Sequence, residues 1–199
     1  MLGVLRWLAG FPLAALHRLG APAGWLAYAL SPSYRRRFIA NARQAGLGPA
    51  ESRPAIAEAG RLLLELPRLW LRPAGEPISP PVRWEGADAI DAALALGRGV
   101  VFLTPHLGCF EVTAQAYAER YGPRFGPITV LFRPARKAWL RPLVGGSRTR
   151  PGLAAAPATL AGVRQMIRAL RRGEAVGLLA DEVPPAWRDE LASIAAASG

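Results

Sequence analysis

Gly99-Val-Val-Phe-Leu-Thr-Pro-His-Leu-Gly-Cys-Phe-Glu111 is the stretch around which the chain is organised. Its charge-free part, residues 100–103, predicts a buried strand because β-branched and aromatic residues suit a covered, pleated surface. A threonine and a proline end this strand, so His106 falls at its carboxyl end, and a helical pattern opens after Gly108. Ligands of open α/β sheets bind in the crevice beyond the carboxyl ends of the strands. A histidine there, followed by the Glu111 carboxylate, is placed for acid–base chemistry.

The spacing of His106 and Glu111 limits how the two side chains could meet. Five positions along an ideal helix turn a side chain by about 140°, so the pair would not share one helix face. The pairing requires that His106 precede the helix and that the loop turn it back, which Pro105 and Gly108 favour. A carboxylate bonded to one imidazole nitrogen would leave the other to accept a proton from a hydroxyl. A lone histidine is more often structural, so the spacing alone leaves both interpretations open.

Composition limits the class of protein. The chain has 199 residues, 51% of them hydrophobic, which suits one folded core rather than a disordered chain. Its net charge of +11 predicts an anionic partner: nucleic acid, an anionic membrane surface or a phosphorylated substrate. A single cysteine excludes an internal disulfide, and one cysteine with two distant histidines argues against a metal site.

Residues 1–32 are strongly apolar and predict a membrane-associating segment. Arg6 and Arg18 interrupt the segment, so no apolar run reaches the roughly 18–20 residues that span a bilayer. No signal peptide is evident. Leu, Trp and Tyr with scattered Arg favour a place in the membrane interface, with Tyr34-Arg35-Arg36-Arg37 among anionic headgroups. The alternative is a helical hairpin buried in the core.

Patterns after residue 32 predict helices first, and then strands alternating with helices. Residues 33–48 and 54–71 form helices, and in the second Leu63 would pack, Glu65 would face outward and Pro67 would kink or end the helix. Residues 73–81 are rich in proline and predict a linker. The later elements are a strand at 82–85, a helix at 87–96, a strand at 100–103, a helix at 112–121, a strand at 128–132, a helix at 158–172 and a strand at 175–180.

This alternation indicates an α/β fold with a mostly parallel sheet flanked by helices. We assign residues 33–184 to this domain, with N-terminal helices at 33–72 and a catalytic core at 82–184, and residues 185–199 to a tail. The helix at 158–172 would turn four apolar residues toward the core at helical spacing: Leu160, Val163, Ile167 and Leu170.

Three predicted strands are followed by polar groups that could form one site. His106 follows the strand at 100–103, Arg133 the strand at 128–132 and Asp181 the strand at 175–180. If the sheet is parallel, all three lie along one edge and could supply a base, an arginine and an acid to one crevice. Strand ends are also simply polar in many proteins, so the pattern alone leaves that alternative open.

These residues resemble a known family. His106-Leu-Gly-Cys-Phe-Glu111 resembles the H-x4-D/E signature of glycerolipid-type acyltransferases. Three further stretches are similar to the bacterial lipid A late acyltransferases, the lauroyl/myristoyl transferases: Asn41-Ala-Arg, Phe132-Arg133-Pro134 and the run from Gly162 to Asp181. The resemblance extends from Leu2 to Pro184, and its motifs stand in the family's order.

The resemblance implies transfer of an acyl chain from acyl carrier protein to a hydroxyl of a lipid A precursor, with no cofactor. It implies a location at the cytoplasmic face of the bacterial inner membrane. His106 would be the general base, Glu111 would orient it, and Arg133 and Asp181 would bind substrate or support the site. Arg148 and Arg150 could contact a substrate phosphate, or could belong to a solvated basic loop.

Two alternatives remain besides this reaction. One keeps the chemistry but uses another membrane lipid as acceptor, a lysophospholipid or a glycosylated phosphoinositide. The other is a shortened, inactive chain that only binds membranes, because members of the family continue beyond the point where residues 185–199 lose any strand-like pattern. We expect the C-terminal part of the family domain to be missing. Nucleic acid is disfavoured, since the arginines accompany an apolar front end rather than stacking aromatics.

Overall fold

The computed structural model describes residues 2–73, 75–78, 82–132, 141, 145 and 150–179. It contains two compact units, divided between Arg72 and Pro73 at the start of the predicted linker. Residues 1–32 and the helices at 33–72 both belong to the first unit.

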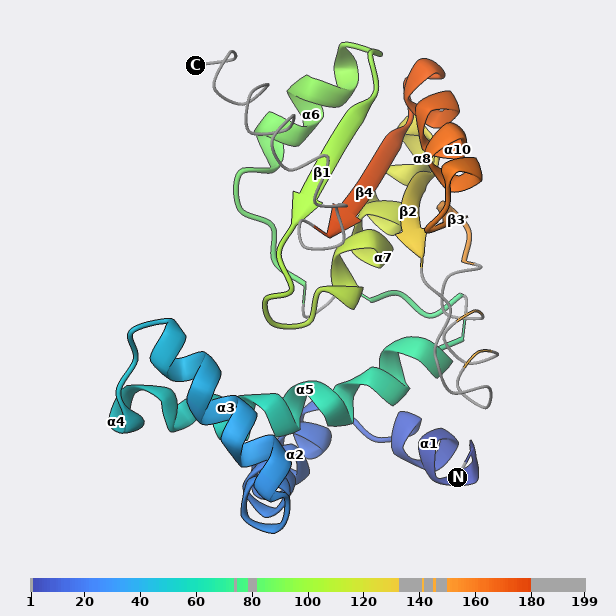
Figure 1. The fold of residues 1–199 in the computed structure, drawn as a ribbon. Helices are drawn as coiled ribbons and strands as arrows, with labels where there is room; N and C mark the ends of the chain where they lie inside the picture. Colours follow the sequence, from blue (N-terminus) through green and yellow to red (C-terminus); the bar gives the residue numbers. More distant parts are fainter. Residues whose placement is uncertain are drawn as a thin grey trace. The chain divides into compact units, whose positions relative to one another are not determined.

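The first unit is helical (Figure 1). Its helices are α1 (Leu2–Ala9), α2 (Leu13–Leu30), α3 (Pro32–Gln44), α4 (Pro49–Ser52) and α5 (Pro54–Leu71). Helix α5 has the predicted bounds and continues past Pro67, so this proline does not end the helix, and a kink at Pro67 stays a prediction. Both Pro67 and Leu69 are buried, and this packing holds the last turn despite the hydrogen bond that proline removes.

Helices α2 and α5 pack backbone against backbone through three glycines. A Cβ atom on Gly60 would lie 2.1 Å from the carbonyl oxygen of Gly20, and one on Gly24 would lie 2.2 Å from that of Ile56. Both distances are far inside van der Waals contact, so any side chain at these positions would force the helices apart. Small residues at such spacing are a known means of bringing two helices close together. Leu16 is fully buried and Ile56 is buried beside this contact.

A polar contact also joins α2 and α5. The imidazole Nε2 of His17 lies 2.8 Å from a carboxylate oxygen of Glu65, whose side chain is only 13% exposed. Leu63, by contrast, is 62% exposed. The predicted roles of these two α5 residues are therefore both wrong, because the partner of Glu65 lies on another helix and cannot be read from the α5 pattern.

Several large apolar side chains are exposed on the helical unit. They are Val4, Trp7, Leu19, Trp25, Leu26, Leu30, Ile39, Leu47 and Leu63. Among the described residues, no helix is both long and apolar enough to cross a membrane. Association of residues 1–32 with a membrane surface stays a prediction.

The second unit is an α/β fold, as predicted. Its elements are α6 (Ala87–Ala95), β1 (Val100–Thr104), α7 (Glu111–Arg120), α8 (Gly122–Phe125), β2 (Ile128–Phe132), β3 (Leu153–Pro157), α10 (Leu160–Arg171) and β4 (Ala175–Leu179). The described strands form one four-stranded sheet in the order β1-β4-β2-β3, and each neighbouring pair is parallel. Residues 82–85 are not a strand, and β3 is a strand that the sequence analysis missed.

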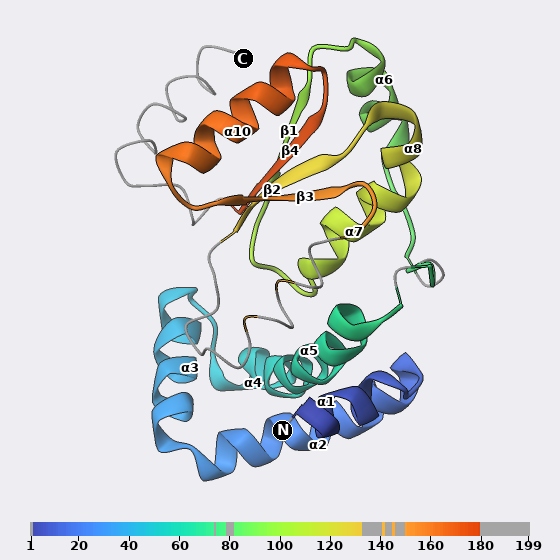
Figure 2. The ribbon, with the colours of Figure 1, turned by 90° about the vertical axis from the view of Figure 1, so that its right-hand side faces the viewer.

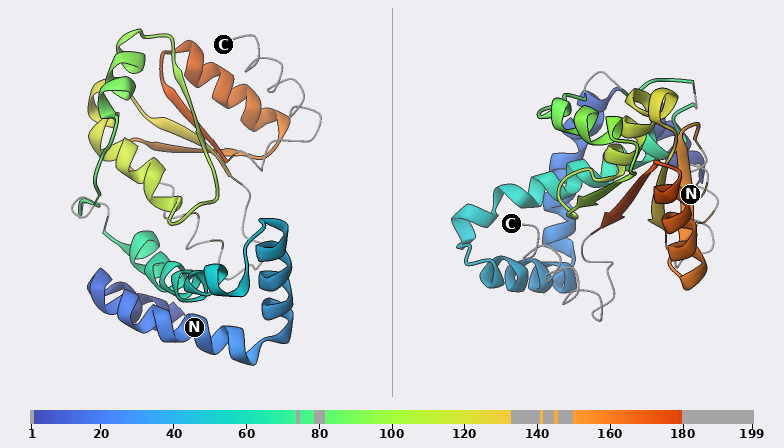
Figure 3. Two further views of the ribbon diagram at one scale, coloured as in Figure 1. Left: turned by 90° about the vertical axis from the view of Figure 1, so that its left-hand side faces the viewer. Right: turned by 90° about the horizontal axis from the view of Figure 1, so that it is seen from above.

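Helices cover both faces of this sheet (Figures 2 and 3). On one face, Leu94 of α6 and Tyr117 of α7 join Ile128 of β2 in a buried cluster. On the other face, α10 packs Met166 and Ala169 against the sheet. The predicted inward stripe on this helix is partly wrong, because Leu160 is 65% exposed and Ile167 is 44% exposed. The residues that pack on the sheet are instead Met166 and Ala169, together with Leu170 of the predicted four.

The glycine contact between α2 and α5 gives a test of the helical unit. In Gly60→Ala the new methyl group must displace the backbone of α2. We expect the free energy of unfolding to fall by about 1–3 kcal/mol, as for other overpacked sites, measured by urea denaturation followed by circular dichroism. Gly3→Ala is the control, because nothing lies within 4 Å of its added Cβ. Equal losses in the two variants would contradict the packing role.

Candidate active site

The carboxyl ends of three neighbouring parallel strands lie at one edge of the sheet. The register pairs Thr104, the last residue of β1, with Leu179, the last residue of β4. Strand β2 pairs with β4 on its other side. His106, Asp181 and Arg133 each follow one of these three neighbouring strands, within two residues of its end. Arg133 and Asp181 themselves lie outside the described residues.

The loop between β1 and α7 turns sharply at His106. The amide of Leu107 donates to the carbonyl of Pro105 at 2.8 Å, and that of Phe110 donates to the carbonyl of Gly108 at 3.1 Å. Gly108 has φ +56°, a left-handed conformation that favours glycine. The chain therefore reverses within a few residues before α7 begins, as the hypothesis of a His106–Glu111 pair requires.

His106 is exposed on this loop, where a substrate can reach it. Its ring meets the ring of Phe110 edge to face, with centroids 4.6 Å apart and planes at 78°. This contact restricts the orientation of the imidazole. A hydrogen bond from His106 to Glu111 stays a prediction.

Glu111 is the first residue of α7. A carboxylate in the first turn is favoured by the unpaired amides and the dipole of the helix. The Glu111 side chain is partly exposed and lines a cavity on the β1 side of the helix. Glu111 is thus held by the start of a helix, while His106 is held by the loop before it.

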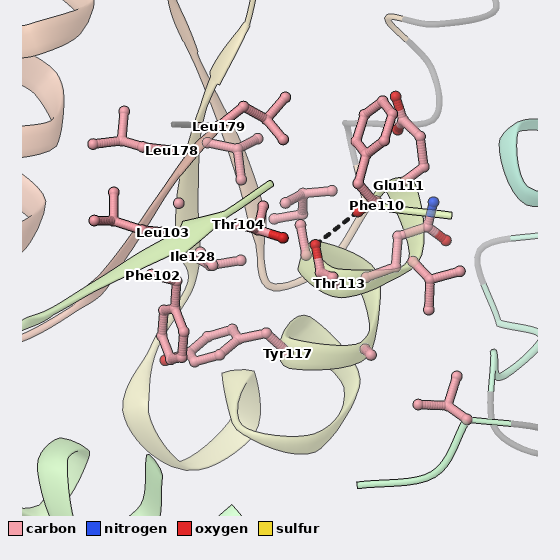
Figure 4. Close-up of a pocket in the computed structure, with 18 of the residues that line it drawn as sticks. Phe102, Leu103, Thr104, Phe110, Glu111, Thr113, Tyr117, Ile128, Leu178 and Leu179 are labelled. Carbon is pink, nitrogen blue, oxygen red and sulfur yellow. Dashed lines mark hydrogen bonds between the residues drawn. The ribbon is translucent and has the colours of Figure 1, made fainter. Parts of the chain in front are cut away.

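A cavity of about 430 Å³ lies between α7 and the sheet (Figure 4). This volume is within the range of about 300–1,000 Å³ that is typical of small-molecule sites. Most of its lining is apolar. The lining residues are Val82, Arg83, Trp84, Ile90, residues 102–104, residues 110–117, Ile128, Val130, Leu131, Leu153 and residues 177–179.

The cavity extends along the strands. Thr104 ends β1 and Glu111 begins α7, so both line the cavity at the strand-end edge of the sheet. Ile128 and Leu153 are the first residues of their strands, and they line the opposite end.

The gap between β2 and β4 helps to open this cavity. The β1–β4 and β2–β3 ladders each contain five residue pairs, whereas the β2–β4 ladder contains three and ends at Val130 and Gly177. Leu131 and Leu178, which follow these residues, line the cavity. Neighbouring strands that separate at their carboxyl ends leave a crevice there.

Tyr117 contributes a buried polar group to the cavity wall. The residue is 3% exposed, and its hydroxyl makes no hydrogen bond to any described part of the chain. Burial raises the pKa of this hydroxyl above its ordinary value, and the negative charge of Glu174 and the neighbouring Tyr121 raise it further. Tyr117 therefore stays neutral at physiological pH.

The remaining predicted residues have other surroundings. Arg150 donates from Nη1 to the carbonyl of Pro73 at 3.2 Å, which ties its loop to the linker. A role for Arg150 in phosphate binding stays a prediction, and Arg148 lies outside the described residues.

In the portion of the chain that the structure describes, no group of three or more His, Cys, Asp or Glu side chains could hold a metal ion.

Sequence reasoning missed most of the cavity wall, including Trp84, Thr113 and Tyr117. These residues come from different elements, and each was expected only to be part of a helix or strand. The one available signal was the mixture of polar and small apolar residues along α7, which is too hydrophilic for a helix buried on all sides.

Comparison with known proteins assigns the chain to a family. The sequence model of the bacterial lipid A biosynthesis acyltransferases matches residues 1–186, which include the first structural unit and most of the second. The chain belongs to this family. Membership confirms the resemblance seen in the motifs and indicates an acyltransferase of lipid A biosynthesis, whose acceptor is a lipid A precursor. A search of the curated proteins finds no match.

Tyr117 predicts how the stability of this lipid A acyltransferase family member depends on pH. Because the pKa of Tyr117 is raised in the folded chain, the unfolded chain releases this proton first, and stability falls as the pH rises above about 10. Tyr117→Phe removes a buried hydroxyl, so we expect the free energy of unfolding to rise by about 1 kcal/mol at neutral pH. We also expect a smaller loss of stability in alkali.

Urea unfolding at a series of pH values measures both effects. Tyr34→Phe, in the helical unit, is the matched control and should keep the alkaline loss of the parent. Parallel alkaline losses in the parent and in Tyr117→Phe would show that this hydroxyl is not the group responsible.

Proposed function

We propose that this protein transfers an acyl chain from acyl carrier protein to a hydroxyl of a lipid A precursor, as a lauroyl/myristoyl transferase. The reaction would take place at the cytoplasmic face of the bacterial inner membrane. The observation that carries the proposal is the largely apolar cavity that Glu111 lines, directly after the loop that holds His106. Such a cavity suits an alkyl chain whose reactive end lies near Glu111.

His106 acts as the general base in this mechanism. It takes the proton of the acceptor hydroxyl as the hydroxyl oxygen bonds to the thioester carbonyl carbon. The carbon–sulfur bond then breaks, and the departing thiol receives the proton from the imidazolium. Glu111 orients the imidazole and stabilises its positive charge during the transfer. The exposure of His106 supports this role, since both large substrates must reach it.

The acyl chain is held by the apolar part of the cavity. Each methylene group removed from water contributes about 0.8 kcal/mol, and side chains such as Ile90, Phe102 and Leu153 provide the surface that replaces water. Since one methylene group changes binding in an apolar pocket by about 1–3 kcal/mol, the length of this cavity selects among acyl chains.

The helical unit suits the membrane side of the reaction. Exposed apolar residues such as Trp7, Leu26 and Leu30 would enter the interface of the bilayer. The adjacent arginines at positions 35–37 would lie among phosphate groups. Apolar contact and the attraction between arginine and phosphate would also retain a phosphorylated glycolipid at this unit.

The two alternatives named from the sequence differ from this proposal in measurable ways. An acyltransferase with another acceptor would modify a lysophospholipid or a glycosylated phosphoinositide and leave lipid A precursor unchanged. An inactive membrane-binding chain would bind vesicles without turnover, whatever the residue at position 111. The direct assay combines the full chain, acyl carrier protein thioester and each lipid, with mass spectrometry of the lipid products.

Substitution of the proposed base and its partner tests the mechanism. In His106→Ala and Glu111→Gln, we expect kcat for lipid A precursor to fall by about 10²–10⁴-fold, because that is the usual contribution of a positioned general base. Acyl transfer is measured by mass spectrometry of the glycolipid.

The control is Glu85→Gln, which removes an exposed carboxylate outside the cavity lining. This variant should retain the activity of the parent. If His106→Ala transfers acyl chains as fast as the parent, the assigned mechanism is wrong.

Filling the cavity tests its role as the acyl-chain site. Ala114 of α7 lines the cavity and packs beside the core. In Ala114→Phe we expect kcat/KM for palmitoyl and myristoyl donors to fall at least about ten-fold more than for an octanoyl donor, because only the longer chains meet the new ring. That ratio corresponds to about 1.4 kcal/mol. Ala92→Phe, at an exposed position of α6, should leave the order of donors unchanged.

A further inference from the structure

The outward face of α10 combines exposed arginines with exposed apolar side chains. At about 100° per residue, five of its residues fall within an arc of about 100°. They are Leu160, Arg164, Ile167, Arg168 and Arg171, and all five are exposed. We refer to these residues as the α10 face. The opposite side of the helix carries Met166 and Ala169, which pack on the sheet.

The positive charge of the α10 face is not compensated by its surroundings. The side chains of Arg164, Arg168 and Arg171 form no hydrogen bond or ion pair with any residue that the structure describes. Helix α10 itself contains no acidic residue. The nearest acid in sequence is Glu174, which accepts two hydrogen bonds from the guanidinium of Arg172 at 2.8 and 2.7 Å. Three neighbouring arginines therefore present unneutralised charge to an external partner.

The position of α10 relates this face to the candidate active site. Strand β3 ends at Pro157 and α10 begins at Leu160, so the helix starts at the same edge of the sheet as the carboxyl ends of the strands. It then runs back along the sheet to the start of β4 at Ala175. Figure 2 shows α10 across the sheet from α7. One end of a partner that lies along α10 would therefore be at the edge of the sheet where β1 ends, two residues before His106.

We propose that the α10 face is the docking surface for the acyl carrier protein. This inference rests on the proposed function, because it places the donor that the reaction requires. Carrier proteins of this class have an acidic surface, and carboxylates about one helical turn apart would match the i, i+4, i+7 spacing of the three arginines. Leu160 and Ile167 supply apolar contacts between the charges.

The pattern of the α10 face favours an acidic protein over a lipid surface. A helix that lies in a membrane interface turns a broad apolar face toward the lipid. In α10 that broad face is buried against the sheet, and only two separated apolar side chains point outward. Complementary charge at an exposed protein surface accelerates association and fixes register. Both effects suit a donor that must bind, deliver one chain and leave.

Charge reversal on the α10 face tests the proposal in the full chain. The variant combines Arg164→Glu, Arg168→Glu and Arg171→Glu. We expect the Kd for the carrier protein bearing its phosphopantetheine arm, measured by isothermal titration calorimetry, to rise at least about ten-fold. In the transfer assay, KM for the carrier thioester should rise similarly while kcat changes less than about two-fold. Transfer from acyl-pantetheine, which lacks the protein part of the donor, should keep the parent rate.

The matched control combines Arg18→Glu, Arg43→Glu and Arg98→Glu, three arginines that are also exposed but lie outside α10. It produces the same change in net charge, and its Kd for the carrier protein should stay within about two-fold of the parent. Equal weakening in both variants would overturn the proposal in favour of a general effect of charge. An unchanged Kd in the α10 variant would also overturn it.

Binding to vesicles that contain anionic lipid tests whether a membrane, rather than the carrier protein, occupies the α10 face. The α10 variant should bind such vesicles as the parent does, and loss of vesicle binding with an unchanged carrier Kd would assign the face to the membrane and overturn the proposal. The results also distinguish an error in the proposed docking surface from an error in the proposed function. Carrier binding through α10 without acyl transfer would refute only the function, and acyl transfer that is indifferent to the α10 charges would refute only the docking surface.

Discussion

Parallel pairing of β1, β4 and β2 is the constraint on which the candidate site depends. Because these neighbouring strands run in one direction, their carboxyl ends share one edge of the sheet, although the strands are far apart in the sequence. The short β2–β4 ladder adds a crevice at that edge. A single antiparallel strand in the middle of this sheet would place its carboxyl end at the opposite edge.

Close backbone approach shapes both units by a similar physical rule. Glycines bring α2 and α5 into backbone contact in the helical unit. In the α/β unit, a Cβ atom on Gly162 of α10 would lie 1.8 Å from the carbonyl oxygen of Pro157. The interface between α10 and the sheet combines the small Ala169 with the longer Met166. Ile167 lies on the outer face of the helix.

Both units expose side chains that suit the proposed reaction between a soluble donor and a membrane acceptor. The helical unit exposes large apolar residues such as Trp7 and Leu30, and also the arginines at positions 35–37. The α/β unit exposes the arginines of α10. The α/β unit also contains the largely apolar cavity that Glu111 lines. Each surface therefore has a distinct proposed ligand: lipid, carrier protein and acyl chain.

The sequence by itself determined the positions of β1, β2, β4 and α5 and the place of the His106–Glu111 stretch, because local runs and periodic patterns encode an element and its breaks. It missed β3, whose Leu153-Ala-Ala-Ala-Pro157 has little intrinsic strand preference and becomes a strand by pairing with β2. Tertiary structure alone decided the strand order, the outward turn of Ile167 and the set of residues around the cavity. The physical reason is that a pattern shows which face of an element is apolar, whereas burial, cavity shape and the pairing of Glu65 with His17 depend on which other element lies against it.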